Sequence, residues 1–280
     1  MSESRITYRN LGEIFVIEID DTNIEVGTID FGYDDSVEGH LAPFNRYVII
    51  RNLYKYPDKV REYAEACQFT NYYAIVNRAP VLRTFAPISN VISNVVLPAL
   101  CESFGRKVVQ RKANEAIGFT EFSYHDPKSI EFHKYDEPHV DSVSNFFQFL
   151  PLHSEFKFKT YVPQKSDDKI LSIAGVIYLD ETFGTEILVN KNVSFYRSEN
   201  TGIWGTPTGP EKSNDNFYPE GSNSHYEPRI VIGGEYNSAA FYYGAVSHRP
   251  WLSGASEEDL KRGRLIQNIW INDVTEMSLN

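Results

Sequence analysis

Residues 169–180 read KILSIAGVIYLD, a run rich in β-branched residues that predicts a β-strand. Short segments of the same kind lie on both sides of this run and are separated by turn residues. They are IGFTEFSY (117–124), IEFHKY (130–135), HVDSVS (139–144), SAAFYYGAVSH (238–248) and RLIQNIWI (264–271). A succession of short strands with such spacing is typical of an antiparallel barrel or sandwich.

The first part of the chain has a different pattern. Residues 11–30 alternate apolar and polar side chains, which predicts a hairpin-like pair of strands, and RYVIIR (46–51) predicts another strand. A helix is expected to begin at Pro57, because proline is favoured in the first turn and apolar residues then recur at helical spacing. A second helix is predicted over about 88–104. We expect both helices to support a sheet.

Residues 190–235 interrupt the strand pattern with a stretch rich in Asn, Gly, Ser, Pro and aromatic residues. A loop of this length within a compact domain is usually functional or mobile. We interpret it as a candidate lid over a substrate, or else as a surface excursion. The aromatic residues that would serve the lid are Phe195, Tyr196, Trp204, Phe217 and Tyr218.

Composition excludes some partners and favours others. The chain of 280 residues has a net charge of −11 and no basic stripe, so nucleic acid is an unfavoured partner. No apolar run approaches the length that spans a bilayer, and the first ten residues lack the apolar core of a signal peptide. Cys67 and Cys101 form neither a CxxC pair nor a zinc spacing. We therefore expect a cytoplasmic protein without a membrane partner.

The residues that suggest chemistry begin with His139 and Asp141. On a strand, residues i and i+2 point to the same face, so this imidazole and this carboxylate can converge on one metal ion. A single His-x-Asp pair is common by chance and needs a third ligand. His248 ends a predicted strand that is rich in aromatic residues, and it is our candidate for this third metal ligand. Two histidines and one carboxylate leave open positions on the metal, as in non-haem iron(II) oxygenases.

Alternatives exist for each ligand. His248, taken alone, is also compatible with a capping or core histidine. His225 is a second candidate for the distal ligand, but its setting resembles a loop. His153 and Glu155 form a second His-x-acid pair, without a Gly-Thr block at the expected distance after it.

Arg264 follows His248 by sixteen residues, at the start of a predicted strand. A guanidinium group binds both oxygens of a carboxylate, so this residue is a candidate anchor for a dicarboxylate that chelates the metal through its other end. Arg262 lies two residues before Arg264 and would share its face of an extended strand, so it is the competing candidate for the anchor.

Three blocks of the chain, in order, resemble the iron(II)- and 2-oxoglutarate-dependent dioxygenases, especially the prolyl-hydroxylase-like branch. They are YDEPHVD (135–141), KILSIAGVIYLDETFGTEIL (169–188) and HRPWLSGASEEDLKRGRLIQNIW (248–270). The resemblance implies a mainly β fold, a double-stranded β-helix (jelly roll or cupin-like barrel) that is supported by N-terminal α-helices. It also implies a single catalytic domain over 1–280, with the N-terminal strands and helices in 1–115 and the jelly-roll core in 116–280.

For function, the resemblance implies an Fe(II) enzyme that uses 2-oxoglutarate and O2, with His139, Asp141 and His248 as metal ligands. Arg264 would anchor 2-oxoglutarate, with the hydroxyl of Tyr124, or else of Tyr135, as its partner. Hydroxylation of a small molecule, such as an amino acid or a natural-product intermediate, is the expected reaction; a peptide is the next choice of substrate. The rival interpretations are a cupin-type metalloenzyme that does not use 2-oxoglutarate, and a non-catalytic jelly-roll binding module.

Overall fold

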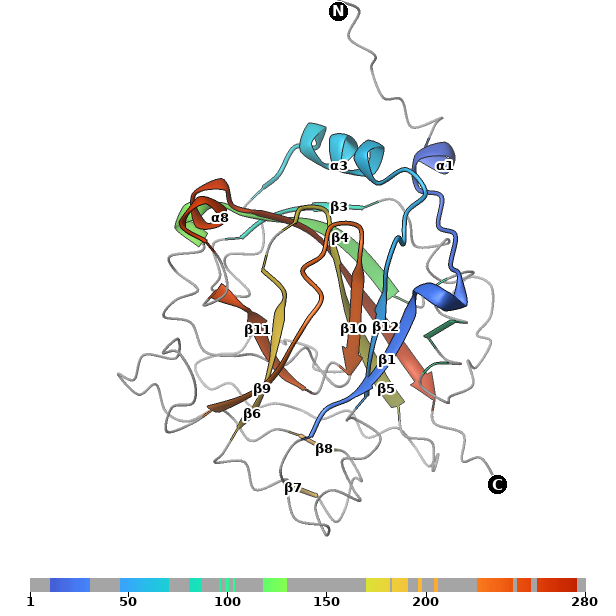
Figure 1. Cartoon of the computed structure of the whole chain (residues 1–280), viewed down its shortest axis with the longest axis vertical. Helices are drawn as coiled ribbons and strands as arrows, with labels where there is room; N and C mark the ends of the chain where they lie inside the picture. The colour runs from blue at the N-terminus through green and yellow to red at the C-terminus, as the bar shows by residue number, and fades with distance from the viewer. Residues whose placement is uncertain are drawn as a thin grey trace, which may run out of the picture.

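Two antiparallel sheets and a few helices make up the described part of the chain (Figure 1). The computed structural model describes residues 11–30, 46–70, 81–86, 96, 99–100, 103, 118–129, 170–181, 183–190, 196–197, 204–205, 226–243, 246–252 and 256–275. No helix in these ranges is long and apolar enough to cross a membrane.

The large sheet has seven strands in the order β1-β2-β10-β5-β12-β4-β3. Every neighbouring pair in it is antiparallel. The strands are β1 (Ile24–Thr28), β2 (Arg46–Ile50), β3 (Leu82–Phe85), β4 (Gly118–His125), β5 (Ile170–Tyr178), β10 (Ala239–Tyr243) and β12 (Arg264–Thr275).

The small sheet has three strands in the order β11-β6-β9: β6 (Thr185–Asn190), β9 (Tyr226–Ile232) and β11 (Ser247–Pro250). A separate two-stranded ribbon joins β7 (Tyr196–Arg197) to β8 (Trp204–Gly205). From β5 onward the chain passes from the large sheet to the small one and back twice, through β6 and β9, then β10, β11 and β12. This arrangement is mainly β and jelly-roll-like.

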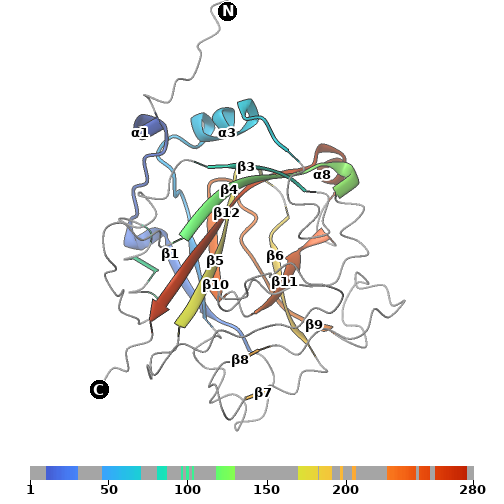
Figure 2. The same cartoon turned by 180° about the vertical axis from the view of Figure 1, so that it is seen from behind.

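The helical elements in the described ranges include α1 (Leu11–Ile14), the 3-10 turn η2 (Asp21–Asn23), α3 (Pro57–Ala66) and α8 (Glu257–Arg262). Helices α1 and α3 lie on the side of the large sheet away from the small sheet, as both views show (Figures 1 and 2). Tyr63 of α3 and Phe15, which follows α1, pack their rings against Phe122 of β4 at centroid distances of 6.1 and 6.3 Å. Pro57 begins α3, as its position in the sequence predicts.

Strand register assigns each side chain of the large sheet to one of two faces, because successive residues alternate. Phe122 faces the helices, and its partner Gln267 on β12 therefore does too. We call this side the outer face. Tyr178 points the other way, and its hydroxyl lies 2.8 Å from the hydroxyl of Thr185 in the small sheet. The side of the large sheet that carries Tyr178 is called the inner face.

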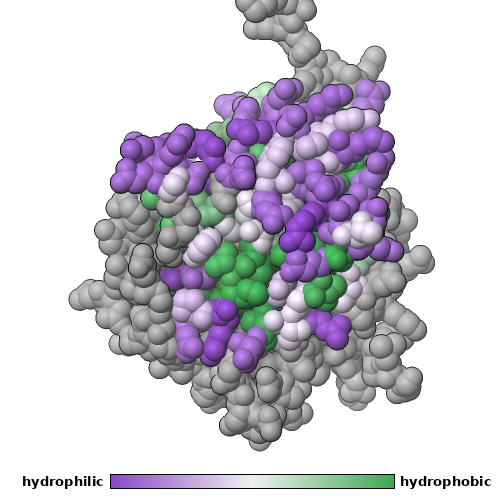
Figure 3. All heavy atoms as spheres, viewed as in Figure 1, coloured by the Kyte–Doolittle hydropathy of each residue, from purple (hydrophilic) through white to green (hydrophobic). Residues whose placement is uncertain are grey.

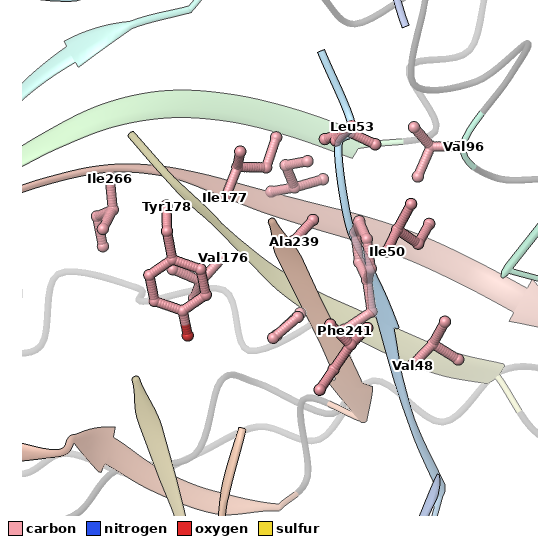
Figure 4. Packing of buried hydrophobic residues seen from close by; sticks show 14 of the residues in the cluster. Val48, Ile50, Leu53, Val96, Val176, Ile177, Tyr178, Ala239, Phe241 and Ile266 are labelled. Atoms are coloured by element: carbon pink, nitrogen blue, oxygen red, sulfur yellow. The ribbon is translucent and has the colours of Figure 1, made fainter. Parts of the chain in front are cut away.

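The apolar core fills the outer face and the centre of the large sheet (Figure 4). Val48, Ile50, Ile177 and Phe241 are among its fully buried members. Full burial of side chains of this size contributes about 1.5–3 kcal/mol each relative to exposure, so this cluster is the main source of stability. Figure 4 also shows Tyr178 extending from β5 toward the strands of the small sheet.

Several predictions made from the sequence need correction. Residues 11–30 form a short helix, a 3-10 turn and one strand instead of a hairpin, because β1 pairs with β2. Residues 238–248 contribute to two strands in different sheets, β10 and β11. The predicted 190–235 insertion contains β9, which pairs with β6. The predicted helix over 88–104 lies mostly outside the described residues.

Helix α8 begins with a capping box that leads to a pH-dependent prediction. The Ser256 hydroxyl donates to the Asp259 carboxylate, the Ser256 N–H does so as well, and the Asp259 N–H donates back to the Ser256 hydroxyl. The hydrogen bond from the Ser256 side chain, with help from Arg262, holds the pKa of Asp259 below its usual value of 3.8. Because the pKa is lower in the folded state, ionised Asp259 stabilises the fold at pH values above its usual pKa. This contribution is lost as the pH falls through the folded-state pKa.

We therefore expect Asp259→Asn to lower the free energy of unfolding by about 0.5–1 kcal/mol at neutral pH. The difference from the wild type should shrink as pH is lowered from neutral to below the folded-state pKa of Asp259, because the aspartate is then protonated and resembles asparagine. Urea unfolding of both proteins at the two pH values measures this. An equal difference at both values would contradict the role of the charge.

Candidate functional site

The predicted site residues fall into two groups. His139, Asp141 and Tyr135 lie outside the described residues, as do His225, His153 and most of the candidate lid. His248, Arg264, Arg262 and Tyr124 are described. Within the described ranges no group of three or more His, Cys, Asp or Glu side chains is placed to hold a metal.

His248 faces the space between the two sheets. It pairs with Ile187, which lies two residues from Thr185 on β6 and therefore on the same face as that threonine. Its side chain is 5% exposed, and its ring contacts the Tyr242 ring of the large sheet at a centroid distance of 4.8 Å and a tilt of 59°. Its Nδ1 lies 2.9 Å from the carbonyl oxygen of Val246. A proton on Nδ1 donated to that carbonyl leaves the lone pair on Nε2, the arrangement found in many metal-binding histidines.

Tyr178 crosses from the large sheet to the small one. Besides the contact with Thr185, its hydroxyl donates to the carbonyl oxygen of Ile232 at 3.2 Å. The ring packs where a Cβ at Gly233 would stand, only 2.3 Å from a ring carbon, and Gly233 has a φ of +68°. Burial raises the pKa of Tyr178, while the charge of Arg264 acts in the opposite direction. The phenol stays protonated at neutral pH and is a hydrogen-bond donor.

Arg264 is the first residue of β12 and is 2% exposed. Register places it on the inner face, because Ile266, two residues later, pairs with Tyr178. Its guanidinium carbon lies 5.3 Å from the centroid of the Tyr178 ring and 5.0 Å from that of Phe183. Arginine is rarely buried this completely, and a guanidinium group that packs against aromatic rings can bind a planar anion through its N–H groups.

Arg262, the competing anchor, has a different environment. It belongs to α8, its side chain is 48% exposed, and it donates to Asp259 at 2.9 Å and to the carbonyl oxygen of Glu181 at 2.7 Å. The structure therefore places Arg264, and not Arg262, between the sheets.

Tyr124 does not lie beside Arg264. It pairs with Leu265, so it shares the outer face with that residue, and its hydroxyl donates to the carbonyl oxygen of Arg262 at 3.1 Å. The expected pairing of its hydroxyl with the Arg264 guanidinium needs correction, because adjacent residues of a strand point to opposite faces. Tyr178 is the described tyrosine that contacts Arg264.

Two residues determine where β12 begins. Gly263 ends α8 with a φ of +86°, and a Cβ there would come within 2.6 Å of the His125 carbonyl oxygen. Asp180, 5% exposed, accepts a hydrogen bond from the N–H of Leu265 at 3.0 Å. Its other carboxylate oxygen lies 2.9 Å from Arg61 of α3. Asp180 thus connects the supporting helix to the backbone beside Arg264.

The inner face also carries a polar cluster on β3, β4 and β12. Arg83 pairs with Glu121 at 2.5 Å, and their side chains are 15% and 2% exposed. The Ser123 hydroxyl lies 3.4 Å from the same Glu121 oxygen, and the Asn268 amide donates to Ser123 at 2.8 Å. Burial raises the pKa of Glu121, and Arg83 opposes that shift. We call these four residues the inner polar cluster.

Searches for similar proteins give neighbours in structure only. No family model matches the chain, and no curated protein is similar in sequence. A prolyl-4-hydroxylase from Pseudomonas putida is similar over 85% of this chain and 97% of its own, at 12% identity and a TM-score of 0.37. EvdO2 from Micromonospora carbonacea var. aurantiaca is similar over 91% of this chain and 96% of its own, at 8% identity and a TM-score of 0.37.

A third neighbour is SnoK, a non-heme alpha ketoglutarate dependent carbocyclase from nogalamycin biosynthesis. It is similar over 75% of this chain and 85% of its own, at 11% identity and a TM-score of 0.26. All three likenesses are low in both identity and TM-score, so the proposal below depends on the residues of this chain.

Sequence reasoning missed Tyr178 and the inner polar cluster. Tyr178 is the last residue of β5, and only the pairing of β5 with β12 shows that it shares a face with Arg264. Glu121 and Ser123 alternate with apolar residues in IGFTEFSY, a pattern typical of a strand with one solvent-facing side. Here both residues are buried, so the pattern indicated the right alternation and the wrong environment.

Proposed function

We propose that this chain is a non-haem iron(II) oxygenase that uses 2-oxoglutarate to oxidise a C–H bond of a small molecule, with hydroxylation as the reaction. The observation that carries the proposal is the placement of His248 and Arg264. These two buried residues come from different sheets and face the same inter-sheet space. A metal ligand and a carboxylate anchor need this relation if one molecule is to bridge them.

His248 fits the metal through its chemistry. Its ring is buried, packed against the Tyr242 ring and oriented by the Val246 carbonyl, so little reorganisation is needed when Nε2 binds a cation. His139 and Asp141 would complete the ligand set, two histidines and one carboxylate.

Arg264 fits the far carboxylate of 2-oxoglutarate. The Tyr178 and Phe183 rings fix its guanidinium group, and the Tyr178 hydroxyl beside it is a donor. Tyr178 therefore replaces Tyr124 as the hydroxyl partner in this proposal, and Tyr135 remains a second candidate. When bound together, iron(II), 2-oxoglutarate and O2 supply the oxidising chemistry, with succinate and CO2 as products of the co-substrate.

The residues of the chain bind, orient and exclude water. Apolar residues of the two sheets, such as Ile187, Ile232 and Val176, are buried around the inter-sheet space. Figure 3 shows an apolar area near the middle of the face seen in Figure 1, bordered by hydrophilic residues. An apolar lining of this kind favours a small-molecule substrate over a polymer.

The test is anaerobic addition of iron(II) and then 2-oxoglutarate to the full-length chain. We expect the weak visible absorption band of an iron(II) keto-acid chelate, and its loss in His248→Ala. His225→Ala is the matched variant, because it removes the competing ligand candidate and should keep the band. Iron binding without the band would favour a metalloenzyme that does not use 2-oxoglutarate. The absence of stoichiometric iron would reject the proposal.

A further inference from the structure

The inner face of the large sheet is divided into an apolar and a polar half. On β5, β10 and β2 the inner side chains include Val176, Ala240, Tyr242 and Ile49, which register aligns across the three strands. On β12, β4 and β3 the corresponding positions carry the inner polar cluster: Asn268, Glu121, Ser123 and Arg83. The apolar half shows that this interior accepts ordinary core residues, so the charges in the other half need a reason.

Stability is a poor reason for the Arg83–Glu121 pair. Taking two charges out of water costs several kcal/mol per ion, and a well-packed apolar pair of similar volume is often as stable or more stable. Glu121 is 2% exposed and burial raises its pKa, which shows that its charged form bears this cost. A ligand that adds a cation beside the carboxylate and an anion beside the guanidinium would reduce that cost.

We propose that the inner polar cluster binds the zwitterionic head group of a free α-amino acid, the substrate of this enzyme. This inference rests on the proposed function and specifies its substrate class. The substrate ammonium group contacts Glu121, and the substrate carboxylate contacts Arg83. Ser123 and Asn268 hold the Glu121 side chain in place through their hydrogen bonds.

The charges match this ligand class. The pair is neutral overall, so a ligand with a single charge would add an uncompensated charge to the buried cluster, whereas a zwitterion adds no net charge. The Arg83 and Glu121 atoms that pair are 2.5 Å apart, and an α-amino acid carries its two charged groups on one carbon atom. A head group of this shape meets both partners without separating them widely.

The location separates this cluster from the co-substrate anchor. Asn268 follows Arg264 by four residues on the same strand and the same face, which corresponds to about 13 Å at the usual rise of a strand. One carboxylate does not reach both. The cluster therefore lies within range of a second small molecule on the face where Arg264 binds the first.

The experiment measures binding of each of the twenty common L-amino acids, and of ornithine and pipecolic acid, to the full-length chain by calorimetry. Each titration is done anaerobically with iron(II) and 2-oxoglutarate, and again in a chelator without either. We expect at least one amino acid to bind. Its N-acetyl and carboxamide derivatives should each bind at least tenfold more weakly, because each removes one of the two charges.

Glu121→Gln and Arg83→Gln should each weaken binding of that amino acid at least tenfold, with circular dichroism and the iron–2-oxoglutarate band unchanged. Arg51→Gln is the matched control. It removes an arginine that pairs with Glu25 and Glu235 at 2.8 and 2.9 Å on an exposed part of the sheet, and it should leave binding unchanged. If the two cluster variants do not fold, the derivatives still test the inference on the wild-type protein.

The inference is overturned if no amino acid in the set binds, if either derivative binds as tightly as its parent, or if a folded Glu121→Gln keeps full affinity. These results are distinct from failure of the proposed function. A visible iron–2-oxoglutarate band without amino-acid binding rejects the substrate class alone. Amino-acid binding in the chelator without any iron band supports the cluster as a site and rejects the oxygenase.

Discussion

Arg264→Ala is expected to raise the 2-oxoglutarate concentration needed for half-saturation by at least roughly thirtyfold, with iron(II) binding unchanged. Removing one partner of a buried, charge-assisted hydrogen-bonded pair typically costs about 2–5 kcal/mol, which corresponds to factors of roughly thirty to several thousand. Arg264 is 2% exposed and packs against the Tyr178 and Phe183 rings, which restrict the conformations of its guanidinium group before binding. Titration of the visible chelate band with 2-oxoglutarate gives the affinity, and metal analysis gives the iron content.

Two further variants make the interpretation of that result specific. Arg262→Ala removes an exposed guanidinium from the end of α8 and should leave the affinity within about twofold, since exposed pairs contribute at most about 1 kcal/mol. Arg264→Lys keeps the charge and loses the two-pronged geometry, so its affinity should lie between those of the wild type and the alanine variant. An unchanged affinity in Arg264→Ala, or a larger loss in Arg262→Ala, would move the anchor away from Arg264.

Asp180→Ala should lower the free energy of unfolding by about 2–3 kcal/mol, the largest effect that we expect on stability. The substitution leaves the buried Leu265 N–H without its acceptor, which costs about 1–3 kcal/mol, and removes the ion-pair partner of Arg61. The ion-pair share is small because the Arg61 side chain is 39% exposed. Urea unfolding measures the change in stability, and the 2-oxoglutarate titration shows whether displacement of the β12 start also weakens the anchor.

The two contacts of Asp180 can be separated. Arg61→Gln removes the ion pair and leaves the Leu265 hydrogen bond intact, so it should cost less than about 1 kcal/mol. Asp180→Asn keeps an acceptor for the Leu265 N–H and should fall between the two. Equal losses of unfolding free energy in Arg61→Gln and Asp180→Ala would show that the ion pair, and not the hydrogen bond to the backbone, stabilises the start of β12.

The parts of the structure that were predicted correctly depend on local pattern. The strands β4, β5 and β12 follow from their apolar and β-branched runs, and α3 follows from Pro57 and its apolar spacing. The mainly β class with supporting helices follows from the order of these patterns. Residues 11–30 were misread as a hairpin because alternation alone does not specify a partner, and β1 finds its partner in β2 across a long connection.

The candidate site residues also differ in how far the sequence alone predicts them. Arg264 was proposed as the anchor from its place at the start of a predicted strand, and strand periodicity gives it the same face as Ile266, which pairs with Tyr178. Tyr178 and Glu121 depend on which strands are neighbours in the sheet, and sequence spacing carries no information about that. Tyr124 was chosen as the hydroxyl partner because the resemblance implies a tyrosine in that role, but its pairing with Leu265 places it on the outer face.

The alternation of side chains along β12 limits the insertions and deletions that this protein can tolerate. Gly263, with its left-handed backbone, sets the residue at which the strand starts, and Arg264 follows immediately. Loss or gain of one amino acid between Gly263 and Gln267 would exchange the inner and outer side chains of this part of β12. The guanidinium group would then point toward the helices, and a leucine or glutamine would point toward the small sheet. Natural length variation in homologous chains should therefore avoid this short stretch, even where single replacements within it are accepted.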